Sequence, residues 1–163
     1  MSAALRELPA ALFALVDPAR GEGVYETLLH FPATRRRSLF DEKENPGILA
    51  AYAPHLVALG SDEVEHLEAL WGDSAVVFLN AAVPFLALRT HFRRFLTVKI
   101  DGRPLYFRFY DPRVLPKFLM DARPDELAAF FGPVETFVLE TDQGAGLALR
   151  LGPAGGVVTR KIS

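Results

Sequence analysis

The chain has 163 residues, of which 50% are hydrophobic and 23% are charged, and its formal net charge is -2 at pH 7. This composition excludes a disordered chain, predicts one domain with a buried core, and argues against nucleic acid or an anionic membrane as a partner. Cysteine is absent, which excludes disulfides, thiol nucleophiles and thiolate metal sites and agrees with a reducing cytosol.

The first apolar stretch, residues 10–16, is short and runs straight into Asp17-Pro18. A secretory signal has a longer apolar region behind a basic start, and the apolar region 75–88 is too short to span a bilayer. We therefore expect a cytoplasmic protein. Residues 12–16 have instead the continuous apolar pattern of a strand that is covered on both faces.

Apolar runs then alternate with helical patterns. Asp17-Pro18 supplies a capping residue followed by proline at the first helical position, so we expect a helix over residues 19–30. Apolar side chains recur at helical spacing in two further segments, which we expect to be helices. These helices cover residues 64–71 and 83–94, and further strands are expected at residues 38–40, 55–59 and 75–79.

The clearest β pattern is a hairpin. Residues 95–100 and 104–110 alternate in the manner of strands and flank Asp101-Gly102-Arg103. Asp-Gly between two such runs is a strong turn signal. Asp111-Pro112 then repeats the cap-and-proline pattern of Asp17-Pro18 and starts a helix through Leu115 and Leu119.

A helix over residues 124–131 ends at Gly132-Pro133, and residues 134–139 and 147–151 form a last hairpin. Strands that alternate with helices and then form hairpins predict an α/β fold. We expect a single domain, residues 1–152, with a mixed β-sheet, helices packed on its faces and a C-terminal hairpin. Residues 153–163 are glycine-rich and are expected to form a short tail.

Charge is unevenly distributed along the chain. Residues 41–73 hold eight acidic residues against Lys43, a balance of -7, and residues 89–117 hold eight basic residues against Asp101 and Asp111, a balance of +6. Such asymmetry can steer an oppositely charged partner. Alternatively, the two segments pack together and their charges cancel.

Few patterns point to catalysis. Glu63-x-x-His66 places two possible metal ligands on one helix face, but di-metal helical sites need this motif twice, so a solvated face is the better interpretation. The chain has no Gly-x-Ser-x-Gly elbow and no phosphate-binding Gly-rich loop with a Lys. We therefore expect no catalytic residues, no metal and no cofactor.

Two aspartates leave a second interpretation open. Asp17 and Asp111 each follow a predicted strand, at the sheet edge where open α/β folds bind ligands. Arg108 and Arg113 lie close to Asp111 in the sequence and would form an ion pair with it or present an anion site. If these residues joined a histidine in a deep polar pocket, the chain would be a small enzyme or ligand-binding protein. The simpler interpretation is that each aspartate caps its helix.

Three stretches carry a family resemblance: His91-Phe92-Arg93-Arg94-Phe95-Leu96, then residues 107–115 (FRFYDPRVL), then Phe130-Phe131-Gly132-Pro133-Val134. In this order and spacing the chain resembles the type VI secretion effector chaperone, or adaptor, family, and the likeness extends over residues 12–139. Asp17-Pro18-Ala19 and residues 53–59 also look like the opening elements of that family.

The resemblance implies a non-catalytic protein that holds a secreted effector and delivers it to the valine-glycine-repeat spike protein or a spike-tip protein. Longer members have a further C-terminal region that helps to choose the effector, and here the chain ends soon after the match. The residues predicted to contact the partner are Arg89, Arg93, Arg94, Arg108 and Arg113, with Asp111 positioning the last two. An immunity or inhibitor protein is a third possibility.

Overall fold

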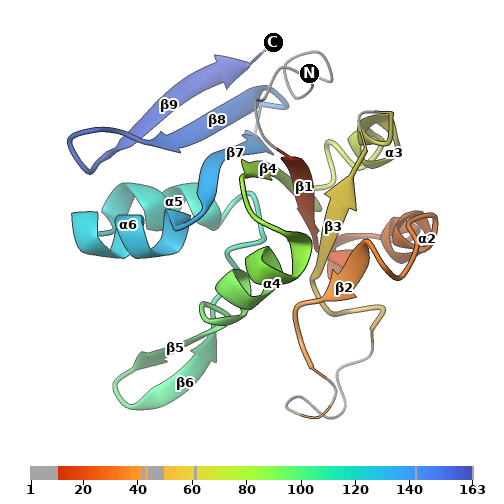
Figure 1. Ribbon diagram of the computed structural model, residues 1–163, viewed down its shortest axis with the longest axis horizontal. Helices are drawn as coiled ribbons and strands as arrows, with labels where there is room; N and C mark the ends of the chain where they lie inside the picture. Colours follow the sequence, from red (N-terminus) through yellow and green to blue (C-terminus); the bar gives the residue numbers. More distant parts are fainter. Residues whose placement is uncertain (1–10, 42, 44–49, 61, 142, 163) are drawn as a thin grey trace.

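The computed structural model describes residues 11–41, 43, 50–60, 62–141 and 143–162. Within these residues seven strands form one sheet in the order β2-β3-β1-β4-β7-β8-β9, and β5 and β6 form a separate hairpin (Figure 1). The strands are β1 (Ala11–Val16), β2 (Arg36–Ser38), β3 (His55–Leu59), β4 (Val76–Ala81), β5 (Thr97–Ile100), β6 (Arg103–Tyr106), β7 (Val134–Glu140), β8 (Gly146–Leu151) and β9 (Val157–Ile162). The helical segments are η1 (Pro18–Arg20), α2 (Val24–Leu29), α3 (Val64–Glu68), α4 (Phe85–Arg93), α5 (Leu115–Asp121) and α6 (Pro124–Phe131).

The predicted α/β class, with helices on the sheet faces and a C-terminal hairpin, is confirmed. Strand β1 lies between β3 and β4 and runs antiparallel to both. Strands β3 and β4 therefore point the same way without being neighbours. The other pairings of the described residues, β2 with β3, β4 with β7, β7 with β8 and β8 with β9, are also antiparallel.

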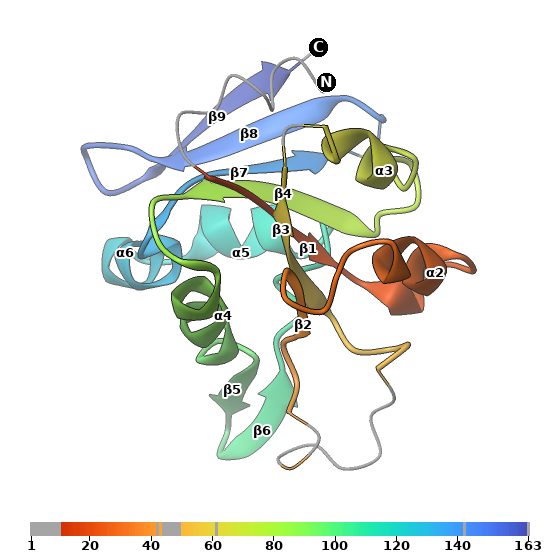
Figure 2. The same ribbon diagram turned by 45° about the vertical axis from the view of Figure 1, so that its right-hand side comes forward.

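Both faces of the sheet are covered, as the continuous apolar run in β1 predicted. Successive side chains of a strand point to opposite faces, and accordingly Phe13 and Leu15 enter one core cluster while Ala14 and Val16 enter the other. Buried side chains of α4, α5 and α6 complete the first cluster, and those of α2 and α3 complete the second. The positions of these helices around the sheet can be followed in Figure 2.

The N-terminal helix is shorter than the sequence pattern predicted. The expected helix over residues 19–30 is divided into η1 and α2, because Gly21 is extended and Gly23 takes a left-handed conformation, with φ of 81°, at the start of α2. The predicted strand at residues 38–40 is displaced toward the N-terminus, to β2. Leu39 is buried in the core immediately after that strand.

An aromatic cluster joins the three stretches that carry the family resemblance. The ring of Phe130 in α6 lies at the centre, since its centroid is 5.1 to 6.4 Å from those of six other phenylalanines. These are Phe92 and Phe95 from the first stretch, Phe107 and Phe109 from the second, and Phe118 and Phe137 from α5 and β7. The three stretches, separate in the sequence, therefore form one packed unit in space.

The C-terminal residues differ from the short tail that the sequence indicated. Within residues 153–163, β9 pairs along its whole length with β8, from Leu151↔Val157 to Gly146↔Ile162. Strand β9 has adjacent valines at 157 and 158 and then Thr159, Arg160 and Lys161, and such a polar, charged composition fits a strand at the sheet edge. Gly155 and Gly156 lie before the strand. Among the described residues, no helix has the length and apolar content needed to cross a bilayer.

Candidate interaction site

The two Asp-Pro turns, far apart in the sequence, share one local hydrogen bond, from the backbone N–H two residues on to the aspartate carboxylate. Asp17 follows β1 and Asp111 precedes α5. Both residues are buried, with 1% of their surface exposed. The backbone N–H of Ala19 donates to Asp17 Oδ1 at 3.2 Å, and that of Arg113 donates to Asp111 Oδ1 at 2.9 Å. Asp17 thus caps η1 as predicted. Asp111 instead holds the turn before α5, because that helix begins at Leu115.

Arg108 connects the two turns. Its Nη2 atom donates to Asp17 Oδ2 at 2.5 Å and lies 3.8 Å from Asp111 Oδ2. Arg113 holds Asp111 with two further bonds, from Nε to Oδ1 at 2.9 Å and from Nη2 to Oδ2 at 2.7 Å. Two-point contacts of this kind fix the plane of a guanidinium as well as its position. We call these four residues the Asp-Arg network.

The charges in the Asp-Arg network stabilise one another. Burial alone would raise the pKa of Asp111, but the hydrogen bonds from Arg113 and the charge of Arg108 lower it below its usual value. Burial would lower the pKa of Arg108, but its bond to Asp17 raises it. The neighbouring Tyr110 has its pKa raised to about 12, by burial and then by the charge of Asp17. Asp111, Arg108 and Tyr110 therefore keep their ordinary charge states at neutral pH.

The carboxylates of the Asp-Arg network are buried, whereas its guanidinium side chains reach the surface. The Arg108 side chain is 44% exposed and the Arg113 side chain is 46% exposed. Arg113 also lines two adjoining grooves at α5, each of which contains Lys117. One groove continues to Pro112, Pro116, Leu139, Glu140, Thr141 and Leu147, and the other to Val114, Phe118 and Asp121. The grooves therefore present the cations Arg113 and Lys117 together with the acidic residues Glu140 and Asp121.

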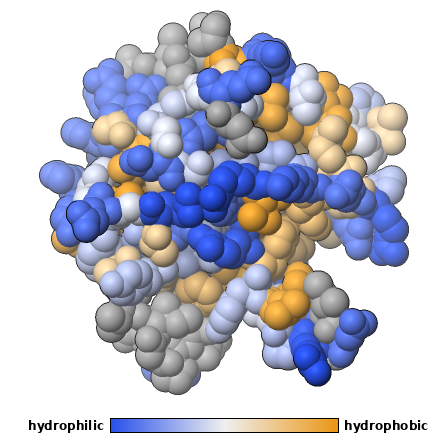
Figure 3. Space-filling view, turned by 180° about the vertical axis from the view of Figure 1, so that it is seen from behind, coloured by the Kyte–Doolittle hydropathy of each residue, from blue (hydrophilic) through white to orange (hydrophobic). Residues whose placement is uncertain are grey.

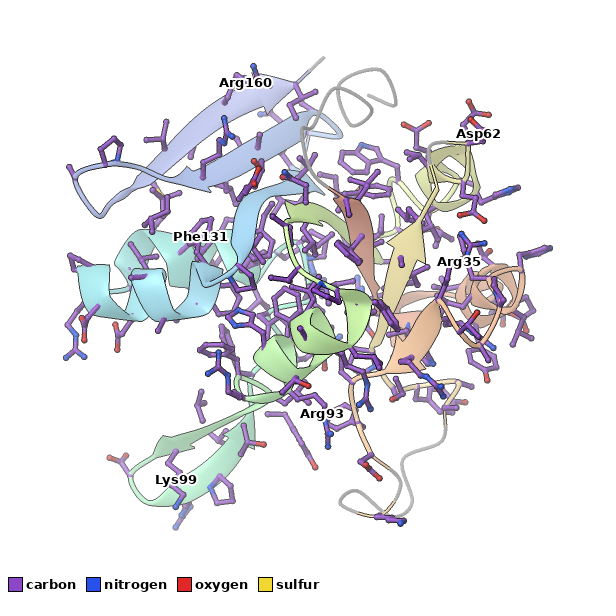
Figure 4. All side chains as sticks on the ribbon, viewed as in Figure 1. Arg35, Asp62, Arg93, Lys99, Phe131 and Arg160 are labelled. Carbon is purple, nitrogen blue, oxygen red and sulfur yellow. The ribbon has the colours of Figure 1, made fainter. Side chains whose placement is uncertain are left out.

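The remaining predicted contact residues lie on α4 and its C-terminal end. Arg89 donates from Nε to the carbonyl oxygen of Ser38 at 2.8 Å, and Arg93 lies 3.9 Å from Asp41. Arg93 is shown on α4 in Figure 4. The Arg93–Asp41 pair joins the basic and acidic segments of the sequence at one point. The six predicted contact residues thus form two groups, one on α4 and one in the Asp-Arg network.

Arg94 takes part in a contact between two of the resembling stretches. Its Nη2 atom donates to His91 Nδ1 at 2.9 Å, so the opposite nitrogen, Nε2, donates to the Phe130 carbonyl at 2.7 Å. Burial, and then the charge of Arg94, lower the pKa of His91. The ring lies against Gly132, where an added Cβ would be 2.4 Å from His91 Cε1. Gly132 is therefore required by the position of His91.

A comparison with protein families matches residues 12–129 to the family described as "Domain of unknown function (DUF4123)", which is more than half of the chain. The chain belongs to the DUF4123 family. The DUF4123 match begins in β1 and ends within α6, so it includes the whole Asp-Arg network and the α4 arginines. No curated protein and no solved structure matches the chain.

The sequence indicated the members of this site but missed one contact. The pairing of Arg113 with Asp111 was open to prediction, because residues two apart in a turn are always close. The bond from Arg108 to Asp17 spans 91 positions, and only the repeated Asp-Pro pattern hinted that the two turns are related.

Glu63 of the Glu63-x-x-His66 motif accepts two hydrogen bonds from Arg35, at 2.5 and 2.7 Å. Among the described residues, no group of three potential metal ligands is found.

Proposed function

We propose that this protein is a non-catalytic adaptor that binds a type VI secretion effector in the cytoplasm and helps to load it onto the spike protein. The proposal is supported by the resemblance of the three stretches to the effector adaptor family and by the way those stretches pack together around Phe130. Membership of the DUF4123 family is compatible with it.

One observation carries the proposal: the carboxylates of the Asp-Arg network are engaged by arginines whose side chains reach the surface. A carboxylate that acts as a base or nucleophile must present an oxygen to the substrate. Asp17 and Asp111 are buried, and the oxygens of both accept bonds from backbone N–H groups and guanidinium groups. This arrangement suits holding Arg108 and Arg113 in fixed orientations for a partner.

Fixed arginines are favourable contact residues. Arginine is enriched in protein interfaces, and a side chain that is already ordered loses less entropy when it binds. Charged groups at an interface mainly raise the association rate and exclude wrong partners. We therefore assign the contact role to the Asp-Arg network and to the α4 group, Arg89, Arg93 and Arg94.

Co-purification tests this proposal. The protein is co-expressed with a spike protein and a candidate effector of the same organism, and each is recovered through a tag on this chain. We expect both to co-purify with the wild type and expect recovery to fall at least fivefold for R93E/R94E. The double variant R150E/R160E, which reverses two exposed arginines of β8 and β9, is the matched control. If R93E/R94E binds as the wild type does, the α4 group is not part of the contact surface.

A second function is favoured by the meeting of Asp17, Arg108 and Asp111 beside the groove at Pro112 and Arg113. A small ligand-binding protein or enzyme would place an anionic group against Arg113 and Lys117. Isothermal titration with inorganic phosphate tests this alternative. Millimolar or tighter binding that is lost in R113Q/K117Q would favour it over the adaptor.

A further inference from the structure

The β5–β6 hairpin stands apart from the main sheet. Strands β5 and β6 pair only with each other, from Thr97↔Tyr106 to Ile100↔Arg103, in the part of the chain that the structure describes. Asp101 and Gly102 form the turn with φ of 50° and 76°, the conformation that closes a tight two-residue hairpin. In Figures 1 and 2 the hairpin projects from the body of the molecule beyond the C-terminal end of α4.

The base of the hairpin is held firmly. The backbone N–H of Phe107 donates to the carbonyl of Leu96 at 2.9 Å, and the Phe107 ring lies in the aromatic cluster, 4.7 Å between centroids from Phe118. Tyr106 makes an edge-on contact with Phe40, at 5.3 Å between centroids. The hairpin is therefore a defined projection from the core and not a loose loop.

Beyond its base, the hairpin exposes apolar side chains. Every residue of β6 is exposed, and Leu105 (49% exposed) lies directly across from Val98 (37% exposed). Tyr106, on the other face, is 57% exposed. An isolated two-stranded hairpin is marginally stable in water, because neither face has a core against it. Apolar side chains grouped on such an element mark a surface that binds another molecule.

Charge indicates what kind of partner this surface fits. Lys99 and Arg103 are exposed on the hairpin and Arg94 is exposed at its base, against one exposed acidic residue, Asp101 in the turn, so these four residues carry a net charge of +2. In Figure 3 the hairpin projects at the lower right, with hydrophobic and hydrophilic surface side by side. A second copy of the hairpin would bring like charges together. An acidic segment with apolar side chains is complementary.

We propose that the β5–β6 hairpin is a docking arm that binds a protein segment in which apolar side chains are flanked by Asp or Glu. The proposal rests on the adaptor function, in that the segment belongs to the spike protein or the effector. Val98 and Leu105 supply the buried apolar contact, and Arg103, on the same face of the hairpin, pairs with a carboxylate at its rim. Lys99, on the opposite face, adds positive charge that attracts the acidic segment. The hairpin is thus a contact surface in addition to the arginines already named.

Affinity measurements with purified spike protein and purified effector test the apolar contact. We expect V98S/L105S to weaken the Kd for one of these two proteins at least tenfold. The matched control is L29S/V158S, which removes two apolar side chains of α2 and β9 that are 53% and 54% exposed, and its Kd should stay within twofold of the wild type. An unchanged thermal midpoint for V98S/L105S would show that the sheet remains folded.

The charged rim is tested with K99E/R103E against R150E/R160E. Figure 4 shows Lys99 and Arg160 at opposite ends of the molecule. We expect K99E/R103E to weaken binding at least fivefold and to reduce the dependence of log Kd on log salt concentration, because fewer ion pairs form. The control should change neither.

The possible failures are distinguishable. If the wild type binds neither protein, the adaptor function is wrong and the docking arm fails with it. If both hairpin variants bind as the wild type does while R93E/R94E does not, the adaptor function stands and the docking arm is wrong. If the protein associates with itself and V98S/L105S abolishes this association, the occupant of the hairpin is a second copy of the chain. If the protein binds a single-stranded DNA oligonucleotide and K99E/R103E abolishes this binding, the occupant is nucleic acid. Either result overturns the proposal.

Discussion

Arg108 Nη2 lies 2.5 Å from Asp17 Oδ2, although the two residues are 91 positions apart. This contact joins the end of β1 to the segment before α5, and so connects the centre of the sheet to the helical layer on one of its faces. Asp17 is buried, while the Arg108 side chain is 44% exposed. The stability of the fold and the orientation of a surface arginine therefore depend on the same bond.

Replacing Arg108 by alanine should destabilise the protein by about 2–3 kcal/mol, because a buried carboxylate loses its cation. The loss is below the ~3–5 kcal/mol of a fully buried pair, because water reaches Arg108. Urea unfolding of R108A, D17N and the double variant measures the coupling between the two residues. R160A, at an exposed position of β9, should change stability by less than about 0.5 kcal/mol. If R108A lowers the free energy of unfolding by as little as R160A does, the Arg108–Asp17 bond does not have the stabilising role given to it here.

Asp111 should make the protein sensitive to acid. The pKa of Asp111 in the folded protein is lower than its ordinary value. The ionised Asp111 therefore contributes its full stabilisation at a pH above the ordinary pKa, and this contribution is lost as the pH falls through the pKa of the folded state. In D111N this contribution is absent at every pH. The free energy of unfolding, measured from pH 6 to pH 2.5, should therefore fall less steeply below pH 4 for D111N than for the wild type. Parallel curves would refute this assignment.

His55 should act in a separate pH window. Burial lowers its pKa from 6.5 to about 4, against the opposing effect of its hydrogen bond with the Ala53 carbonyl. The folded state therefore prefers the neutral ring, and stability is full above pH 6.5 and declines as the pH falls toward 4. The shift corresponds to a loss on the order of 3 kcal/mol. H55Q cannot take up the proton and should show a flatter unfolding free energy between pH 7 and pH 4, as denaturant titrations at each pH will measure.

Gly132 should tolerate no side chain while His91 is present. In G132A the new Cβ would meet His91 Cε1 at 2.4 Å, and φ of 48° adds backbone strain. We expect a loss of about 2–4 kcal/mol in chemical unfolding. H91A should relieve the steric part, so G132A should cost less in the H91A background than in the wild type. Gly156, where an added Cβ meets nothing within 4 Å, is the control position, and an equal loss in G156A would argue against the steric explanation.

Periodicity and turn signals in the sequence determined most of the secondary structure. Continuous apolar runs identified β1, β3 and β4 because strands covered on both faces need apolar residues at every position. Asp101-Gly102 identified the β5–β6 hairpin because few residues other than glycine, asparagine and aspartate accept the positive φ of its turn. The cap-and-proline pattern located both Asp-Pro turns. The strand at the C-terminus was missed, since Gly155 and Gly156 precede it and three consecutive polar residues, Thr159, Arg160 and Lys161, separate its apolar positions.

Only the tertiary structure decided which distant groups meet. The sequence placed Arg113 beside Asp111, because local turns bring near neighbours together, but it could not place Arg108 against Asp17. That contact depends on how the helical layer packs on the sheet, and packing is set by many apolar contacts at once. The same holds for the hairpin. The sequence pattern predicted its strands, whereas its separation from the main sheet, and with it the exposure of Val98 and Leu105, is a property of the tertiary structure.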